Sequence, residues 1–282
     1  MITILVPLSR PEGGETVLKA AFAIAGRFDG HVRVLHVRSN LAEALHTAGM
    51  ELSGSMRRSA LELGERHAAE AADAVRTLFD EYCAANGISV VQDPPGPGGV
   101  SASWREETGK EDLIVARRGR LSDLVVMAQP DKDRPVLDTL EAALLHTGRP
   151  VLILPPDPPE KIGSTIALGW NGSEVAAKVA VAIRPLLAKA ERVVVLTAPD
   201  GATASAEDMV EELAWHGISA EAHAFEAGER PAGTALLAEA KALGADVLVL
   251  GGYGKSRARG IIMGSVTGYM LAESDLPVLM LH

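Results

Sequence analysis

Cysteine and aromatic residues are scarce in this sequence. Cys83 is the single cysteine in 282 residues, so no disulfide bond can form within the chain. This usage fits a reducing compartment, and we expect the protein to be cytoplasmic. Aromatic residues make up only 4% of the chain, whereas alanine, leucine and valine are abundant. That bias is typical of helices packed on a parallel sheet.

Long apolar runs and excess positive charge are also lacking. Met1 leads directly into a short strand-like run, and the sequence shows neither a targeting segment nor a membrane span. The net charge of −10 argues against a general binder of nucleic acid or of a membrane surface. With 47% hydrophobic and 23% charged residues, the chain can bury real cores, and its length suits two domains.

Apolar strand-like runs alternate with helical patterns along the whole chain. This alternation predicts βαβ units, with parallel strands and right-handed crossovers. The expected strands are 2–8, 31–36, 101–107 (as an edge strand), 123–128, 150–154, 165–170, 192–198, 218–225, 246–251 and 277–281. The expected helices are 15–28, 56–85, 110–119, 139–146, 174–190, 205–215, 231–243 and 265–272.

The second half of the chain repeats the first in residues as well as in pattern. The run Asp123–Ala128 parallels Asp246–Gly251, and Arg149–Leu154 parallels Leu276–Leu281. A period of about 140 residues is the size of a domain rather than of a solenoid repeat. The proline-rich run 155–159 is stiff and cannot pair in a sheet, so we place the linker there. The expected domains are 1–156 and 162–282.

A glycine-rich stretch follows the strand expected at 246–251. Gly251 and Gly254 precede a basic loop, after which Gly264-Ser265 opens a helix. Glycines let the backbone approach a ligand closely, and a helix N-terminus attracts anions, so the stretch predicts a phosphate pocket. The stretch is not a P-loop, because that motif needs a glycine at position 249, where this chain has Val249. It is not a dinucleotide-binding fingerprint either, because that motif needs a glycine at position 257, where this chain has Arg257.

The spacing Gly251-x2-Gly254-x9-Gly264-Ser265 resembles the nucleotide-binding signature of the universal stress protein family. Lys255, Val266 and Thr267 also fit the usual sequence of that family. The resemblance covers nearly the whole chain and implies two tandem, five-stranded, doubly wound parallel-sheet domains of Rossmann-like type. It further implies that the two copies pair through their final strands, and a homodimer of such chains is possible.

The resemblance also implies a site for an adenine nucleotide, expected to be ATP, in the second copy. The glycines, Ser265 and Val266 would wrap the ribose and phosphates, while backbone near Ala198 would meet the adenine. Asn171 stands where ATP-binding members commonly carry aspartate, which puts a role for Mg²⁺ in doubt, and Trp170 is expected to narrow the pocket. The expected nucleotide-binding residues are Gly169, Asn171, Ala198, Leu250, Gly251, Gly254, Lys255, Gly264, Ser265, Val266 and Thr267.

The first copy lacks this signature. Ala128-Gln129-Pro130-Asp131 replaces the first glycines, and Leu137-Asp138 replaces Gly264-Ser265. Asp138 is a good N-cap for its own helix, and its carboxylate would repel a phosphate there. We therefore expect that the first copy has lost the nucleotide site and serves for pairing or as a separate surface. Binding of another ligand at the same place remains an alternative.

Other chemistry-bearing residues have simpler explanations. Lys255, Arg257 and Arg259 either contact phosphate or form a solvated loop, and Asn171 either binds ligand or only shapes a turn. The three tryptophans are expected to be packing residues, and Cys83 an inert core or interface residue. His216 and His223 lack the spacing of metal ligands, so no metal site is assigned.

The function that we expect is a regulatory or protective stress-response protein that binds an adenine nucleotide. No catalytic residue can be assigned, because Ser173 and Ser265 have no identifiable base. Enzymatic activity beyond weak ATP hydrolysis is therefore not expected. One alternative is a slow ATP hydrolase or nucleotidyl-transfer enzyme, and another is a ligand-free protein-interaction module. ATP, AMP and cyclic nucleotides cannot be distinguished from the sequence.

Overall fold

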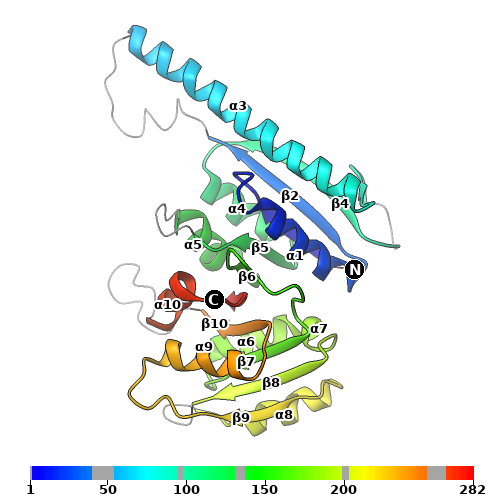
Figure 1. Cartoon of the computed structure of the whole chain (residues 1–282), viewed down its shortest axis with the longest axis vertical. Coiled ribbons are helices and arrows are strands. Elements are labelled where there is room, and N and C mark those ends of the chain that lie inside the picture. Colours follow the sequence, from blue (N-terminus) through cyan, green and yellow to red (C-terminus); the bar gives the residue numbers. More distant parts are fainter. Residues whose placement is uncertain (1, 40–53, 95–97, 131–136, 199–202, 253–264) are drawn as a thin grey trace.

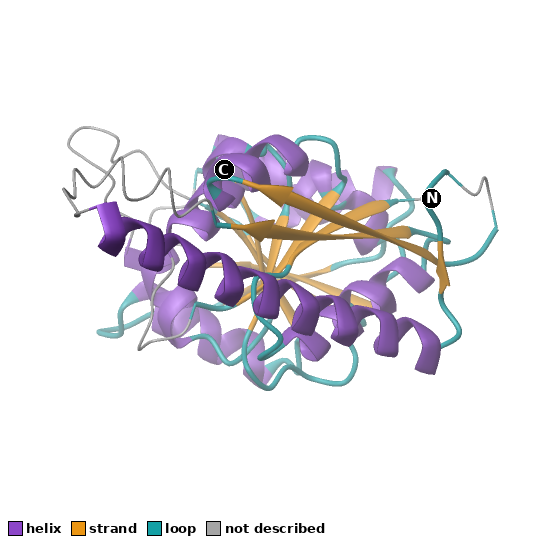
Figure 2. Cartoon of the chain, turned by 90° about the horizontal axis from the view of Figure 1, so that it is seen from above, coloured by secondary structure: helices purple, strands orange, loops and turns teal. Residues whose placement is uncertain are grey.

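One eleven-stranded sheet forms the centre of the molecule. A computed structural model describes residues 2–39, 54–94, 98–130, 137–198, 203–252 and 265–282. The strand order is β3-β4-β2-β1-β5-β6-β11-β10-β7-β8-β9. Figure 2 shows the strands as a central layer, with helices on both sides. The predicted α/β class with parallel, doubly wound sheets is confirmed.

The first half of the chain supplies the strands from β3 to β6 in that order. Its strands are β1 (Thr3–Pro7), β2 (His31–Arg38), β3 (Ser89–Val90), β4 (Ser101–Thr108), β5 (Leu124–Ala128) and β6 (Val151–Leu154). Its helices are α1 (Gly14–Gly26), α3 (Gly54–Ala85), α4 (Glu111–Gly119) and α5 (Leu137–His146). β3 pairs with β4 over only two residues and adds a sixth strand that the sequence pattern does not predict.

The second half supplies the remaining five strands. These are β7 (Thr165–Gly169), β8 (Arg192–Thr197), β9 (Glu221–Ala224), β10 (Val247–Gly251) and β11 (Val278–Leu281). Its helices are α6 (Glu174–Ala182), α7 (Arg184–Leu187), α8 (Ala206–Trp215), α9 (Ala232–Ala242) and α10 (Ser265–Glu273). Every neighbouring pair of strands within each half is parallel, as the alternation of strands and helices predicts.

The two halves meet through their last strands. β6 and β11 pair in antiparallel fashion, with Leu152 opposite Leu279. This antiparallel pair joins two parallel sheets into one, as the family resemblance implies for paired copies. Figure 1 shows the first half above this junction and the second half below it.

Three expectations for individual elements are wrong. The single helix expected over 174–190 is divided at Ile183 into α6 and α7. Pro185 explains the break, because proline lacks an N–H and its ring clashes with the carbonyl of the residue four positions earlier. The strand expected over 218–225 is shorter, since β9 contains only Glu221–Ala224. Asp138 lies inside the first turn of α5 and does not cap it.

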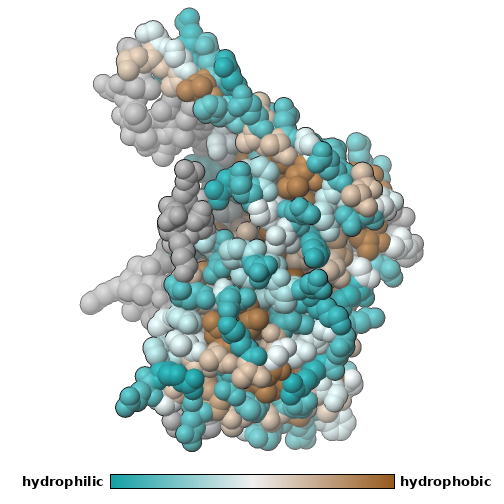
Figure 3. All heavy atoms as spheres, in the orientation of Figure 1, coloured by the Kyte–Doolittle hydropathy of each residue, from teal (hydrophilic) through white to brown (hydrophobic). Residues whose placement is uncertain are grey.

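Trp215 and the first half of α3 lie outside the packed core. Trp215 ends α8 with 81% of its surface exposed, so the expectation that it packs is wrong. The buried residues of α3 are Ala72, Val75, Phe79 and Cys83, all in its second half. The first half of that helix stands away from the body of the molecule (Figures 1 and 3).

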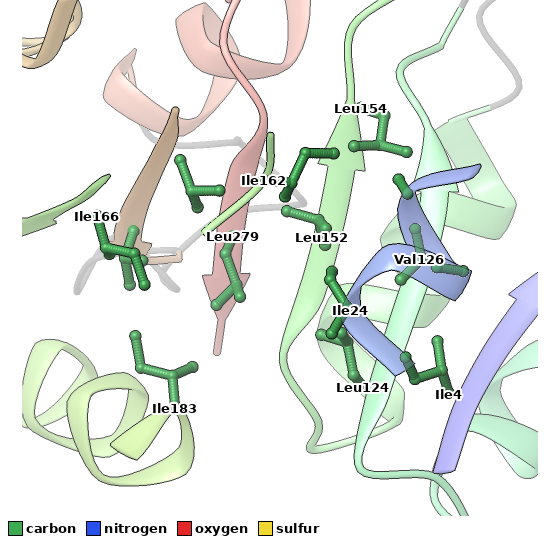
Figure 4. Packing of buried hydrophobic residues seen from close by; sticks show 14 of the residues in the cluster. Ile4, Ile24, Leu124, Val126, Leu152, Leu154, Ile162, Ile166, Ile183 and Leu279 are labelled. Carbon is green, nitrogen blue, oxygen red and sulfur yellow. The ribbon is translucent and has the colours of Figure 1, made fainter. Parts of the chain in front are cut away.

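The hydrophobic core lies on both faces of the sheet and crosses the junction. One cluster contains residues from α1 and α3 of the first half together with α6 and α8 of the second. Figure 4 shows Leu152 of β6 and Leu279 of β11 beside each other, with Ile24 of α1 and Ile162 nearby. The opposite face buries residues from α4, α5, α9 and α10. The two halves therefore share continuous cores.

Polar contacts reinforce the junction. The guanidinium of Arg27, just after α1, donates to the main-chain oxygens of Ile162 (3.2 Å) and Gly163 (3.0 Å). Gln129 Nε2 in the first half donates to Leu271 O in α10, at 2.8 Å. Both links run from a side chain of the first half to carbonyls of the second, so they fix the two halves in one relative position.

Candidate functional site

The candidate site lies where the strand order of the second half reverses. From β7 the chain proceeds outward to β8 and β9, then crosses back so that β10 and β11 lie on the other side of β7. Ligands of doubly wound sheets bind outside the carboxyl ends of the strands at such a reversal. The carboxyl ends of β7 and β10 are Gly169 and Gly251, two of the residues predicted from the sequence.

The turn after β7 is held by its own hydrogen bonds. Asn171 Oδ1 accepts from the backbone N–H of Ser173 at 3.1 Å, so this side chain shapes the turn. Asn171 O accepts from Thr203 N, also at 3.1 Å, which ties the turn to the segment before α8. Gly172 has φ = +71°, where L side chains are disfavoured. The segment from β7 to α6 is thus a preformed turn.

Ser173 then caps α6. Its Oγ accepts from the N–H of Ala176 at 3.2 Å and satisfies one of the free donors of the first turn. The helix N-terminus, with its partial positive charge, therefore begins directly beside the end of β7.

Gly251 is a candidate nucleotide-binding residue, and the packing of β10 on α6 also requires a glycine there. A Cβ placed on Gly251 would lie 2.9 Å from Ala176 N and 3.1 Å from the carbonyl carbon of Val175. Because these are backbone atoms, they cannot move aside cheaply. The absence of a side chain therefore lets the end of β10 touch the first turn of α6. Close packing also occurs at Gly169, whose added Cβ would lie 2.7 Å from Leu250 Cδ2.

Two buried polar side chains at the ends of β7 and β8 have no hydrogen-bond partner among the residues that the structure describes. They are Trp170 Nε1 and Thr197 Oγ1, in residues that are 8% and 6% exposed. The parallel register pairs Gly169 with Leu196, so Trp170 and Thr197 occupy the next matched positions. Trp170 packs in the hydrophobic cluster shared with α6 and α8. Its ring is thus a core residue, as expected for the tryptophans, and Ala198 follows Thr197 at the same edge.

The predicted residues of α10 differ in exposure. Ser265, its first residue, is exposed, Val266 is half-buried, and Thr267 is buried. Leu250 is buried in β10. Gly254, Lys255 and Gly264, with the neighbouring Arg257 and Arg259, lie outside the described residues. The described parts of the candidate site come from the ends of β7, β8 and β10 and from the starts of α6 and α10.

The matching edge of the first half has different chemistry. Asp123 Oδ2 accepts from Thr3 N as Asp246 Oδ2 accepts from Thr165 N, which aligns the two halves. At the position of Thr197, the first half has His36, which is 2% exposed and whose Nδ1 lies 2.8 Å from Leu8 O. The His36 ring stacks on Trp104, at 6.0 Å between centroids.

Ser9 occupies the position of Asn171 in this alignment. Its hydroxyl donates to Glu111 Oε1 at the start of α4. Sequence reasoning overlooked His36 and Glu111. Aligning the two copies strand by strand would have drawn attention to His36, because it replaces a small residue at the same strand end.

Cys83, His216 and His223 are other side chains of types that can take part in catalysis or metal binding. Burial raises the pKa of the Cys83 thiol to about 11, so it stays protonated and unreactive at neutral pH. His223 Nε2 pairs with Glu239 at 2.7 Å, and His216 Nε2 with Glu212 at 3.2 Å. Within the described ranges, no group of three or more histidine, cysteine, aspartate or glutamate side chains could hold a metal ion. In the same part of the chain, no helix is long and apolar enough to cross a membrane.

Comparisons with known proteins place these features in a family. The model of the universal stress protein family matches residues 164–282. A universal stress protein from Archaeoglobus fulgidus DSM 4304 has a similar structure, with a TM-score of 0.72 and 15% identity, over 99% of this chain and 97% of that one. A candidate universal stress protein from Pseudomonas aeruginosa UCBPP-PA14 gives a TM-score of 0.55 and 17% identity, over 100% and 93%. None of the curated proteins compared with the chain matches it.

The family match covers the half that carries the glycine signature, and the similar structures extend over both halves. At these identities the structures show the fold alone. Residues 164–282 therefore form a domain of the universal stress protein family, and the N-terminal half of the chain folds like a second domain of the same kind.

Proposed function

We propose that the second half of the chain binds an adenine nucleotide, with ATP as the main candidate, at the carboxyl ends of β7 and β10. The observation that carries this proposal is the position of Gly169 and Gly251 at the reversal of strand order. There the end of β10 touches the N-terminus of α6, a place that favours a phosphate. The glycine signature that begins at Gly251 supports the same ligand.

Two buried polar atoms at the ends of β7 and β8 give the proposal further support. Trp170 Nε1 and Thr197 Oγ1 are buried without partners in the described part of the chain, and buried polar groups are normally satisfied by protein, water or ligand. The proposed roles are those expected from the family: a regulatory or protective function in the stress response, in the cytoplasm.

Isothermal titration calorimetry with ATP, with and without Mg²⁺, tests the proposal directly. We expect saturable 1:1 binding, with AMP titrated in parallel to rank the nucleotides. Turnover is measured on the same samples, and fast hydrolysis would favour the enzyme alternative. No heat of binding at millimolar ATP would contradict the proposal and favour the ligand-free interaction module. Gly264→Asp, chosen from the sequence because the backbone is expected to approach the ligand closely there, should abolish binding and leave the fold intact.

Asn171→Asp gives a sharp test of the metal question. An aspartate oxygen can accept the same hydrogen bond from Ser173 N–H, so the turn should keep its shape. The new carboxylate adds the charge that Mg²⁺ prefers. We expect the variant to melt at the same temperature as the parent and to bind ATP more tightly with Mg²⁺ than without it. Equal affinities in both conditions would show that position 171 does not contact the metal.

A further inference from the structure

The two halves present opposite charges on two helices at different places in the molecule. In the first half, α4 carries exposed Leu113 and Arg117 one turn apart, and exposed Leu121 follows another turn on. In the second half, α8 carries exposed Glu207, Glu211 and Trp215 with the same four-residue spacing. Residues four apart lie on one face of a helix, so Leu113 with Arg117, and likewise the three residues of α8, form a stripe, while Leu121 lies just beyond the end of α4 at Gly119.

The surface around the C-terminal part of α4, here called the arginine face, is rich in arginine although the chain has a net charge of −10, whereas the first turn of the same helix carries Glu111 and Asp112. Arg105, Arg117 and Arg118 all contact the single carboxylate of Glu107, with N–O distances of 3.7, 2.5 and 2.5 Å. These arginines lower the pKa of Glu107 against the opposing effect of its burial, so this carboxylate is ionised at neutral pH. Three positive charges then face one negative charge.

Three more arginines extend this surface at the C-terminal end of α4. Arg33 donates to Leu121 O at 3.4 Å, Arg149 Nη2 to Arg120 O at 3.1 Å, and Arg120 Nε to His146 O at 2.8 Å. Carbonyl oxygens accept these hydrogen bonds without cancelling the charges. The arginine face therefore combines net positive charge with two exposed leucines, Leu113 and Leu121, each 63% exposed.

The corresponding helix of the second half serves as an internal control. α9 buries the same side of the sheet as α4, but the exposed large apolar residues of the described chain include none on α9. Its Lys241 pairs with Asp275, and nearby His223 pairs with Glu239. The fold of the domain therefore does not require exposed leucines and unbalanced arginines at this helix.

The complementary surface is on the chain itself. The outer face of α8, here called the acidic face, consists of Glu207, Glu211 and the 81% exposed Trp215. Carboxylates suit the arginines, and an exposed indole suits both leucine side chains and guanidinium groups. α4 and α8 contribute to the two core clusters on opposite faces of the sheet, and Figure 1 shows them in different halves of the molecule, so the two faces cannot meet within one molecule.

From this complementarity we propose that the arginine face of one molecule binds the acidic face of a second copy of this chain. The contact joins two different surfaces, so each copy still has one free surface of each kind. Such a heterologous contact produces rings or open chains and not a simple two-fold dimer. Because the contact depends on charge, it weakens as salt screens the arginines and carboxylates.

Sedimentation velocity over a range of concentrations tests this association. We expect the average mass of the wild-type protein to rise with concentration in about 0.05 M NaCl, and the apparent affinity to fall by at least about tenfold in about 0.5 M NaCl. Trp215→Ser should weaken association in low salt without changing the melting temperature, because that side chain is exposed. A wild-type protein that stays monomeric at every concentration in low salt would overturn the proposal.

A charge exchange identifies the two surfaces. Arg117→Glu and Glu211→Arg should each abolish self-association, since each places like charges opposite one another. Mixing these two variants, or combining both changes in one chain, should restore it. Lys241→Glu, the same charge change on α9, is the matched control and should associate like the wild type. Failure of the mixture to associate, while each variant remains folded by circular dichroism, would overturn the assignment of the faces.

Discussion

Single residues decide how closely the elements of the second half approach each other. Gly251 and Gly252 are adjacent in the sequence, yet only the first is closely packed. A Cβ on Gly251 would lie 2.9 Å from a backbone nitrogen, whereas the nearest atom to a Cβ on Gly252 is Leu281 O at 3.4 Å. The sequence pattern assigns both to one glycine-rich turn and cannot separate a glycine needed for packing from one that is merely tolerated.

The adjacent glycines form a matched pair of variants. Gly251→Ala should lower the free energy of unfolding by about 1–3 kcal/mol, because the methyl group is forced against the backbone of α6. It should also weaken nucleotide binding, since the end of β10 must move. Gly252→Ala should be nearly neutral in chemical denaturation. Equal stabilities of the two variants would contradict the close contact.

His31 makes the stability of the first half depend on pH. Burial, with a smaller effect of nearby Arg33, lowers its pKa below the ordinary value of 6.5. Its Nδ1 and Nε2 each lie 2.8 Å from a hydroxyl, of Ser101 and Ser103 respectively. The unfolded chain therefore binds a proton more readily than the folded one, and stability falls as the pH drops below about 6.5.

Replacement of His31 by Gln should flatten this dependence. The wild type should lose more unfolding free energy than His31→Gln between about pH 7 and about pH 5, as measured by urea denaturation. Because the other histidines are present in both proteins, they act as an internal control. Parallel pH profiles for the two proteins would show that His31 does not carry the effect.

At the scale of elements, the sequence predicts types and order well and boundaries less well. Strong apolar runs such as those of β1, β5 and β10 are identified with errors of one or two residues, because burial on both faces of a parallel sheet leaves a continuous apolar signal. β9 and β3 are poorly predicted, since their residues are mostly exposed and carry no such signal. The break at Ile183 follows from Pro185, whereas the helical spacing on both sides of it predicts one continuous helix.

The position of the candidate site could be predicted from the sequence, but several of its contacts could not. The ends of β7 and β10 follow from glycine spacing and strand order. The packing role of Gly251 could not be predicted, and neither could the atoms of Trp170 and Thr197 that lack partners among the described residues, because these features depend on neighbours distant in the sequence. The hydrogen bond of Asn171 to Ser173 is local, and a turn was one of the two roles that the sequence left open for Asn171. His36 and Glu111 were overlooked because neither belongs to a recognisable motif.

Two serine caps allow the role of α6 to be tested. Ser173 caps α6 beside the candidate site, whereas Ser205 caps α8 through a reciprocal pair of hydrogen bonds with Asp208. Either serine changed to alanine should cost about 1 kcal/mol of stability. Only Ser173→Ala should weaken ATP binding in calorimetry. A similar loss of affinity in Ser205→Ala would indicate a general effect of stability instead.

At the scale of the whole molecule, the shared cores predict that the two halves unfold together. Trp104 reports on the first half, and Trp170 on the second. Variants that retain one of these tryptophans should show coincident fluorescence transitions in urea, because one core cluster contains residues of both halves. Leu279→Asp, which places a carboxylate within the junction between β6 and β11, should destabilise both transitions equally. Separate midpoints would show that the halves are thermodynamically independent.

The antiparallel junction also determines which strand edges face water. Its two strands, Val151–Leu154 and Val278–Leu281, are entirely apolar, and each would be an open hydrophobic edge if its half existed alone. Such edges readily pair with other chains and aggregate. In the joined molecule, the outermost strands are instead the two-residue β3 and the short, mostly exposed β9, which begins with Glu221. Joining two copies in one chain thus covers the most apolar final strand of each, and the edges left open among the described strands are the short β3 and β9 and the part of β4 beyond Ala102, which carries Arg105, Glu106 and Glu107.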